Sequence, residues 1–144
     1  MNHKPVVIAS DHAGFDLKAE LCTELRRLGY TYEDLGTHSR ESVDYPDFGQ
    51  ALARAVSEER ADRGVLVCGT GIGISMAANR TPGIRAALCW NTTATRLARQ
   101  HNDANVLSLG ARLVADEVAK DCLRVFLETH FEGGRHERRV AKLG

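Results

Sequence analysis

The chain has 144 residues, and its 19 lysines and arginines balance 19 aspartates and glutamates, so the formal net charge is zero. A composition of 43% hydrophobic and 26% charged residues is that of an ordinary globular protein, and the length suits one domain spanning residues 1–144. A neutral chain gives no electrostatic reason to expect a nucleic acid or an anionic membrane as its partner.

The sequence also argues against secretion and membrane insertion. No apolar run approaches the roughly 18–20 residues of a membrane-spanning helix, and the run at residues 6–9 is too short for the core of a signal peptide. The cysteines at positions 22, 68, 89 and 122 form no CxxC pair and show no zinc-type spacing. Scattered thiols without a secretion signal predict reduced cysteines and a cytoplasmic protein.

The first part of the chain predicts two strands with a helix between them. The short apolar run at residues 6–9 is typical of a buried strand. Leucines at positions 17, 21, 25 and 28 recur at helical spacing and mark one face of a helix, which Gly29 is expected to end. Residues 30–35 predict a second strand, and residues 36–39 are typical of a loop.

The middle of the chain carries the clearest strand. Before it, a helix capped by Asp47 is predicted to run to about residue 60. The strand covers residues 65–68 and ends on the glycine-rich segment 69–73. A short helix around residues 75–79 is expected to follow it.

The rest of the chain continues the alternation. Strands are predicted at residues 84–89 and 105–109, with a helix at 92–100 between them and a long final helix from 114 to about 130. Short apolar strands that alternate with amphipathic helices favour a parallel sheet covered by helices on both faces. Ligands of such sheets bind beyond the carboxyl ends of the strands.

Polar side chains gather near several predicted strand ends. Asp11 and His12 follow the first strand, Cys68 and Thr70 lie at the end of the third, and His101 lies in a polar run that precedes the fifth. We expect the fold to bring these segments together. An acid, two histidines, a thiol and a hydroxyl then predict a functional site.

The glycine-rich segment indicates an anion site that is not a nucleotide site. Gly69, Gly71 and Gly73 let the backbone approach a ligand and direct N–H groups at an anion, although a tight strand-to-helix turn also explains them. A dinucleotide-binding GxGxxG fails in both registers, because Ile74 or Met76 stands where the last glycine belongs. No GxxxxGK[ST] phosphate loop is present either.

Cys68 differs from the other cysteines by its position. Converging N–H dipoles beside a thiol stabilise the thiolate, which acts as a nucleophile or as a general base, and spacing alone does not decide between these roles. Cys22 and Cys122 fall within predicted helices, and Cys89 ends a strand without a glycine loop, so all three are expected in the core.

The C-terminal segment is locally basic. Four cationic residues against one glutamate give residues 133–144 a surplus of 4 − 1 = +3. If the segment is helical, Arg135 and Arg139 share one face and suit a phosphate group. The alternative is a solvated basic tail.

Six segments match one family pattern in order, namely residues 10–14, 44–47, 68–73, 77–79, 99–103 and 132–136. On these motifs the chain resembles the type B ribose-5-phosphate isomerases, the family that also includes the galactose-6-phosphate isomerase subunits. The resemblance implies a Rossmann-like three-layer αβα sandwich with a central parallel sheet. It also implies an aldose–ketose isomerase that needs no metal or cofactor and interconverts ribose 5-phosphate and ribulose 5-phosphate through a cis-enediolate. A six-carbon substrate, allose or galactose 6-phosphate, is the alternative within the family, and a non-catalytic phosphate-binding module is the alternative outside it.

The resemblance further implies a role for each matching residue. Cys68 is the expected base that moves a proton between C1 and C2, and Thr70 assists at the sugar oxygens. The N–H groups of the loop are expected to hold the enediolate, and that loop contains Gly69, Gly71, Ile72 and Gly73. Part of the family uses a glutamate after this loop as the base, but Ile74 stands there and Cys68 is present.

The remaining roles concern the sugar ring and the phosphate. His101 is expected to open the furanose ring, Asp11 and Tyr45 to contact the hydroxyls and the ring-oxygen region, and Asn102 to contact the enediolate region. The residues expected to bind the phosphate are His12, Arg112, Arg135 and Arg139. The resemblance also implies a homodimer or tetramer with shared active sites, in which His101 and Arg112 come from the partner chain.

Overall fold

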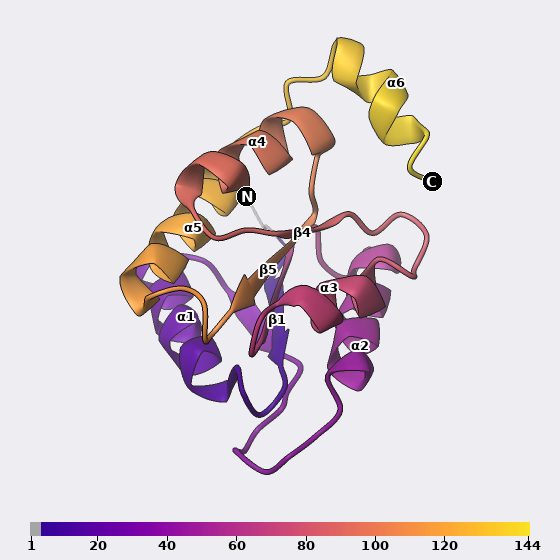
Figure 1. The fold of residues 1–144 in the computed structure, drawn as a ribbon. Helices are drawn as coiled ribbons and strands as arrows, with labels where there is room; N and C mark the ends of the chain where they lie inside the picture. The colour runs from indigo at the N-terminus through magenta and orange to yellow at the C-terminus, as the bar shows by residue number, and fades with distance from the viewer. Residues whose placement is uncertain (1–3) are drawn as a thin grey trace.

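The structure is a computed structural model that describes residues 4–144, and these residues form a five-stranded parallel sheet and six helices. The strands are β1 (Val6–Ser10), β2 (Tyr32–Asp34), β3 (Gly64–Cys68), β4 (Ala86–Leu88) and β5 (Val106–Gly110). The helices are α1 (Phe15–Arg27), α2 (Tyr45–Ser57), α3 (Ile72–Ala78), α4 (Thr92–Asn102), α5 (Asp116–Glu128) and α6 (Arg135–Ala141). The strand order is β2-β1-β3-β5-β4 (Figure 1).

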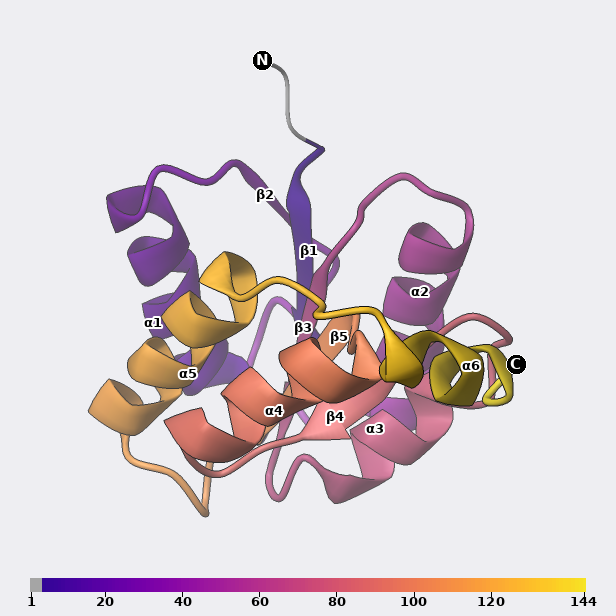
Figure 2. The same ribbon diagram turned by 90° about the horizontal axis from the view of Figure 1, so that it is seen from above.

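Helices cover the sheet on both faces, as Figure 2 shows, so the predicted three-layer αβα arrangement is confirmed. Helices α1, α4 and α5 lie on one side, while α2 and α3 lie on the other. None of the helices within residues 4–144 combines the length and the apolar composition that a membrane span requires.

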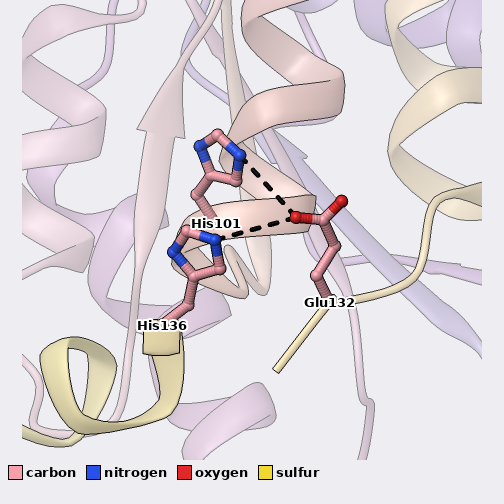
Figure 3. Close-up of side chains that lie close together, drawn as sticks. All are labelled: His101, Glu132 and His136. Atoms are coloured by element: carbon pink, nitrogen blue, oxygen red, sulfur yellow. Dashed lines mark ion pairs between the residues drawn. The ribbon is translucent and has the colours of Figure 1, made fainter. Parts of the chain in front are cut away.

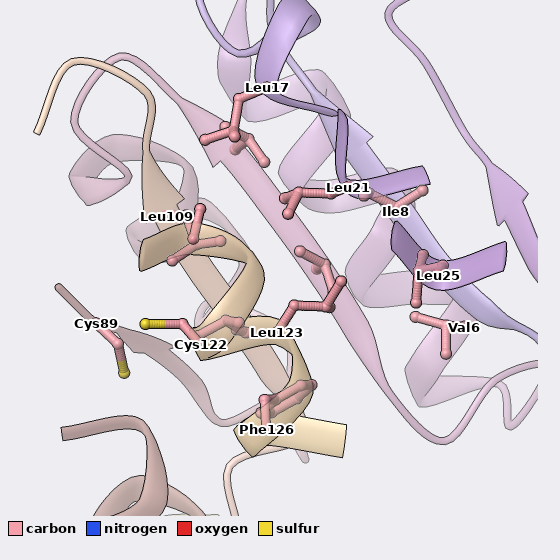
Figure 4. Packing of buried hydrophobic residues seen from close by; sticks show 14 of the residues in the cluster. Val6, Ile8, Leu17, Leu21, Leu25, Cys89, Leu109, Cys122, Leu123 and Phe126 are labelled. Atoms are coloured by element: carbon pink, nitrogen blue, oxygen red, sulfur yellow. The ribbon is translucent and has the colours of Figure 1, made fainter. Parts of the chain in front are cut away.

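Alternating side chains of the central strands fill two separate cores. Val6 and Ile8 of β1 pack in one cluster with α1 and α5, whereas Val7 and Ala9 pack in the other with α2 and α3. Figure 4 shows the first cluster, in which leucines of α1 and the side chains of Leu123 and Phe126 of α5 pack on the same face of the sheet. Because helices bury β1 on both faces of the sheet, its sequence is a continuous apolar run rather than an alternation of apolar and polar residues.

The strand order places a switch point between β1 and β3. The chain passes from β1 through α1 to β2 on one side, and then crosses through α2 to β3 on the other side of β1. Connections therefore leave β1 and β3 in opposite directions, which opens a crevice at their carboxyl ends. Asp11 follows β1 there, and Cys68 is the last residue of β3.

Two predicted boundaries are wrong for physical reasons. Asp47 does not cap α2, because the helix starts at Tyr45 with Asp44 at the N-cap and Pro46 in the first turn, where proline's missing N–H costs nothing. Helix α3 starts at Ile72 rather than near residue 75, because the preceding Gly71 has a φ of +77° and turns the chain directly into the helix.

Candidate active site

A cavity of about 490 Å³ lies at the carboxyl ends of β1 and β3. The predicted site residues that line it are Asp11, His12, Tyr45, Cys68, Gly69, Thr70, Ile72, Gly73 and Arg112. Ala13 and Met76 also line it and were not predicted. Gly71, the remaining predicted residue of the glycine-rich loop, lies between β3 and α3. Because β3 pairs with both β1 and β5, the ends of these three strands lie side by side, as expected.

The thiol of Cys68 is held against the glycine loop. Its residue is 5% exposed, and the Gly71 N–H donates a hydrogen bond to Sγ at 3.1 Å. Only glycine fits position 71, because an added Cβ would lie 2.8 Å from the carbonyl carbon of Leu109 and the φ is +77°. The hydrogen bond fixes the sulfur against the turn that leads into α3.

The start of α3 organises the other side of the cavity. The Ile72 N–H donates to Oγ1 of Thr70 at 3.2 Å, which fixes the hydroxyl beside the loop. The Tyr45 ring lies directly over Gly73, where an added Cβ would meet ring carbons at 2.6 Å. Tyr45 can therefore reach the cavity only because position 73 has no side chain.

Asp11 and His12 are oriented by the backbone around them. The Gly14 N–H donates to Oδ1 of Asp11 at 3.1 Å, so the carboxylate closes the turn that begins α1. The Val43 N–H donates to Nδ1 of His12 at 3.1 Å. A neutral His12 then carries its proton on Nε2, which leaves an N–H donor for a ligand anion.

Arg112 lies in the cavity of its own chain, contrary to the expectation that it comes from a partner. Its Nη1 atom is 3.3 Å from the position of a Cβ added to Gly69. The backbone N–H of Arg112 donates to the Gly69 carbonyl at 2.9 Å. The sheet register explains this placement. Gly110 of β5 is paired with Cys68 of β3, so Arg112 comes just beyond the same edge.

His101 and Asn102 do not join the cavity of their own chain, so the expectation that one chain brings His101 to Cys68 is wrong. Helix α4 begins after the carboxyl end of β4 and runs back toward the start of β5. Its last turn therefore lies at the amino edge of the sheet, opposite Cys68. Asn102 lines a different cavity of about 380 Å³ together with Asn79, Arg85 and Leu143.

The basic C-terminal segment is helical, as its spacing allowed. Arg135 and Arg139 lie on α6, are exposed and do not line the Cys68 cavity. Figure 1 shows α6 extending from the end of the molecule that is opposite the loop between β1 and α1. Within one chain, the residues expected from the resemblance to bind the phosphate therefore lie at two ends of the molecule. His12 and Arg112 line the Cys68 cavity, whereas Arg135 and Arg139 lie on α6.

Three side chains form a second polar cluster beside the end of α4 (Figure 3). The rings of His101 and His136 are stacked, with centroids 4.4 Å apart and an interplanar angle of 15°. Oε1 of Glu132 lies 3.8 Å from Nε2 of His101 and 3.7 Å from Nε2 of His136. Burial lowers the pKa of His136, and the neighbouring His101 and Arg135 lower it further.

One potential metal-binding atom from each of His101, Glu132 and His136 lies within 4.8 Å of the other two. This separation is short enough to ask whether the cluster could hold a metal ion. A metal ion binds a histidine nitrogen in the plane of the imidazole ring. Because the two rings are stacked and nearly parallel, an ion in one ring plane lies outside the other. The arrangement does not fit one ion held by both histidines.

Lys18 is a buried cation near the end of β1 that was not predicted from the sequence. It is 2% exposed, and its ammonium group donates to both carboxylate oxygens of Asp34 at 2.6 and 2.7 Å and to the Thr37 carbonyl at 2.7 Å. The Thr37 N–H in turn donates to the Ser10 carbonyl at 2.7 Å, directly before Asp11. A lysine on the apolar face of α1 was the signal that could have revealed it.

Comparison with known proteins places this geometry among sugar-phosphate enzymes. A model of the Ribose/Galactose Isomerase family matches residues 6–143. Ribose-5-phosphate isomerase B of Escherichia coli (strain K12) is 45% identical over 137 residues, which cover 95% of this chain and 92% of that protein.

Solved structures agree with this comparison. Ribose-5-phosphate isomerase B of Clostridium thermocellum superposes with a TM-score of 0.96 at 51% identity, over 97% of this chain and 95% of that one. The type B enzyme of Trypanosoma brucei superposes with a TM-score of 0.96 at 43% identity, over 99% and 97%.

Proposed function

The chain belongs to the ribose/galactose isomerase family, and on that premise we propose that it interconverts ribose 5-phosphate and ribulose 5-phosphate without a metal or cofactor. The observation that carries the proposal is Cys68, whose sulfur accepts a backbone hydrogen bond at the base of a ligand-sized cavity. Relatives named as ribose-5-phosphate isomerase B support the choice of sugar.

In the proposed reaction the thiolate of Cys68 takes the proton from the carbon beside the carbonyl. The C–H electron pair becomes the double bond of a cis-enediolate, and the carbonyl oxygen gains the negative charge. N–H groups of the loop at residues 69–73 stabilise that charge, an effect typically worth several kcal/mol in enzymes. The hydroxyl proton of the neighbouring carbon passes to the oxyanion, a transfer that Thr70 would assist, and that carbon's oxygen becomes the new carbonyl oxygen. The thiol returns its proton to the same neighbouring carbon, which completes the interconversion of aldose and ketose.

A second copy of the chain is needed to complete the site. We propose a homodimer in which His101 and Asn102 reach the Cys68 cavity of the partner, where His101 opens the furanose ring. Exposed apolar side chains support such an interface, since Met76 at the cavity is 64% exposed and Trp90 is 57% exposed.

The same pairing would complete the phosphate site. His12 and Arg112 stand in the cavity of one chain, and Arg135 and Arg139 of the other would add two guanidinium groups. Guanidinium pairs bind a phosphate dianion well, and that remote binding energy can be used at the reacting carbons.

An isomerase assay tests the proposed function directly. Ribose 5-phosphate, allose 6-phosphate and galactose 6-phosphate are supplied in turn, with a chelator present. We expect ribose 5-phosphate to be converted fastest. Faster conversion of a six-carbon sugar would overturn the choice of substrate, and no conversion of any of them would overturn the enzymatic assignment.

The proposal extends to location and organisation. We propose that residues 1–144 act as one sugar-phosphate isomerase domain in the cytoplasm, in keeping with four cysteines that all lie in the described part of the chain and are all free.

A further inference from the structure

One carboxylate outside the Cys68 cavity faces the histidine to which the proposed reaction assigns ring opening. Oε1 of Glu132 lies 3.8 Å from Nε2 of His101, and the same oxygen lies 3.7 Å from Nε2 of His136. The side chain of Glu132 is 51% exposed, so burial does not force it into this position.

The main chain holds Glu132 in place. Its N–H donates to the carbonyl of Gln100 at 3.0 Å, one residue before His101. Nε of Arg99 donates to the carbonyl of Thr129 at 3.0 Å. The last turn of α4 thus binds the segment that carries Glu132 at two points, and the carboxylate and the imidazole are fixed on one rigid support.

The groups around His136 oppose its protonation, with one exception. Burial, His101, Arg135 and Arg139 all lower the pKa of His136, and Glu132 acts in the opposite direction. Glu132 is the one carboxylate among these groups, and it faces the more exposed His101 as closely as it faces His136. Two charged groups near the end of α4, Arg99 within the helix and Asp103 just after it, pair with each other at 2.8 Å.

We propose that Glu132 is a positioning residue for His101, which it orients for ring opening; this rests on the proposed function above. In that step the bond between C1 and the ring oxygen breaks, and the ring oxygen keeps the electron pair and takes a proton from His101. The C1 hydroxyl loses its proton to water as its oxygen becomes the carbonyl oxygen. His101 then regains a proton from water.

The test compares Glu132→Gln with a matched control, Glu128→Gln, which changes an exposed carboxylate that faces Arg124 instead. Saturating initial rates are measured from ribose 5-phosphate, which is cyclic, and from ribulose 5-phosphate, which stays open because its C5 oxygen carries the phosphate. We expect Glu132→Gln to lower kcat for ribose 5-phosphate by about 10-fold and kcat for ribulose 5-phosphate by less than about 2-fold. Glu128→Gln should match the wild type on both sugars.

Equal losses of kcat on both substrates would overturn the positioning role, and so would a Glu132→Gln rate equal to that of the control. Thermal unfolding of both variants shows whether any loss comes from misfolding. Failure of the proposed function is visible separately, because the wild-type chain would then convert neither sugar.

Discussion

The backbone N–H of Gly71 donates a hydrogen bond to the Sγ atom of Cys68 across 3.1 Å. This contact joins the last residue of β3 to the residue before α3 and directs a peptide dipole at the sulfur. On the proposed mechanism, one glycine-rich turn therefore supplies the base and the donors for the charge that the base creates.

Replacing Cys68 by alanine tests the role of the thiol. We expect kcat to fall on the order of 10³-fold, because general base catalysis is lost, while calorimetry still detects binding of ribose 5-phosphate. Cys22→Ala is the control, since Cys22 is a buried residue of α1 away from the cavity and burial raises the pKa of its thiol. A Cys68→Ala variant with the wild-type rate would show that another group is the base.

Gly71→Ala should damage both the fold and the site. The alanine residue must keep a positive φ, and its Cβ would lie only 2.8 Å from the Leu109 backbone. We therefore expect the free energy of unfolding to fall by about 3 kcal/mol. Gly83→Ala separates these effects, because Gly83 has a φ of +84° but nothing lies within 4 Å of its Cβ position. The control should lose only about 1 kcal/mol and keep its activity. Urea unfolding and isomerase rates check both variants, and equal destabilisation would refute the close contact.

The central strands were predictable from sequence, and the edge strands less so. Residues 6–9 and 65–68 lie in strands with neighbours on both sides, where a continuous apolar run is the direct consequence of burial. The runs at 30–35 and 84–89 became the shorter β2 and β4, the two edge strands, each with only one neighbour to hold its ends.

The candidate site was predictable only where residues follow a strand directly. Asp11 and Cys68 meet because their strands are adjacent and parallel. The strand-end pattern alone was wrong in bringing His101 to Cys68 within one chain, because the position of His101 depends on the direction in which α4 returns along the sheet. The contact between Glu132 and His101 depends on a hydrogen bond between segments far apart in the chain, which no local pattern encodes.

Lys18→Met should destabilise the protein, because it leaves the Asp34 carboxylate and the Thr37 carbonyl without their buried cation. We expect a loss of about 3 kcal/mol in the free energy of unfolding. Lys4→Met is the comparison, since Lys4 is 45% exposed and its 3.6 Å pair with Asp62 contributes little. Urea titration of both variants measures the difference, and similar midpoints would mean that the Lys18 pair adds nothing to stability.

His136 should make stability depend on pH. Because the pKa of His136 is lowered in the folded state, the unfolded chain binds more protons at mildly acidic pH. Its contribution to stability is therefore full above the unfolded pKa of about 6.5 and is lost as the pH falls through the lower folded value. His136→Asn should flatten the fall of the urea midpoint between about pH 7.5 and pH 5, whereas His38→Asn, which changes an exposed residue, should leave it unchanged. An unaltered slope in His136→Asn would contradict this assignment.

The central claim, that Cys68 of one copy works with His101 of another, is tested most directly by mixing two inactive chains. Cys68→Ala and His101→Asn chains are unfolded, combined in equal amounts, refolded and assayed with ribose 5-phosphate. In a two-fold symmetric dimer, half of the dimers are mixed and each has one intact site, so roughly a quarter of the wild-type activity should return. Activity no greater than that of the two variants refolded separately would contradict the shared site.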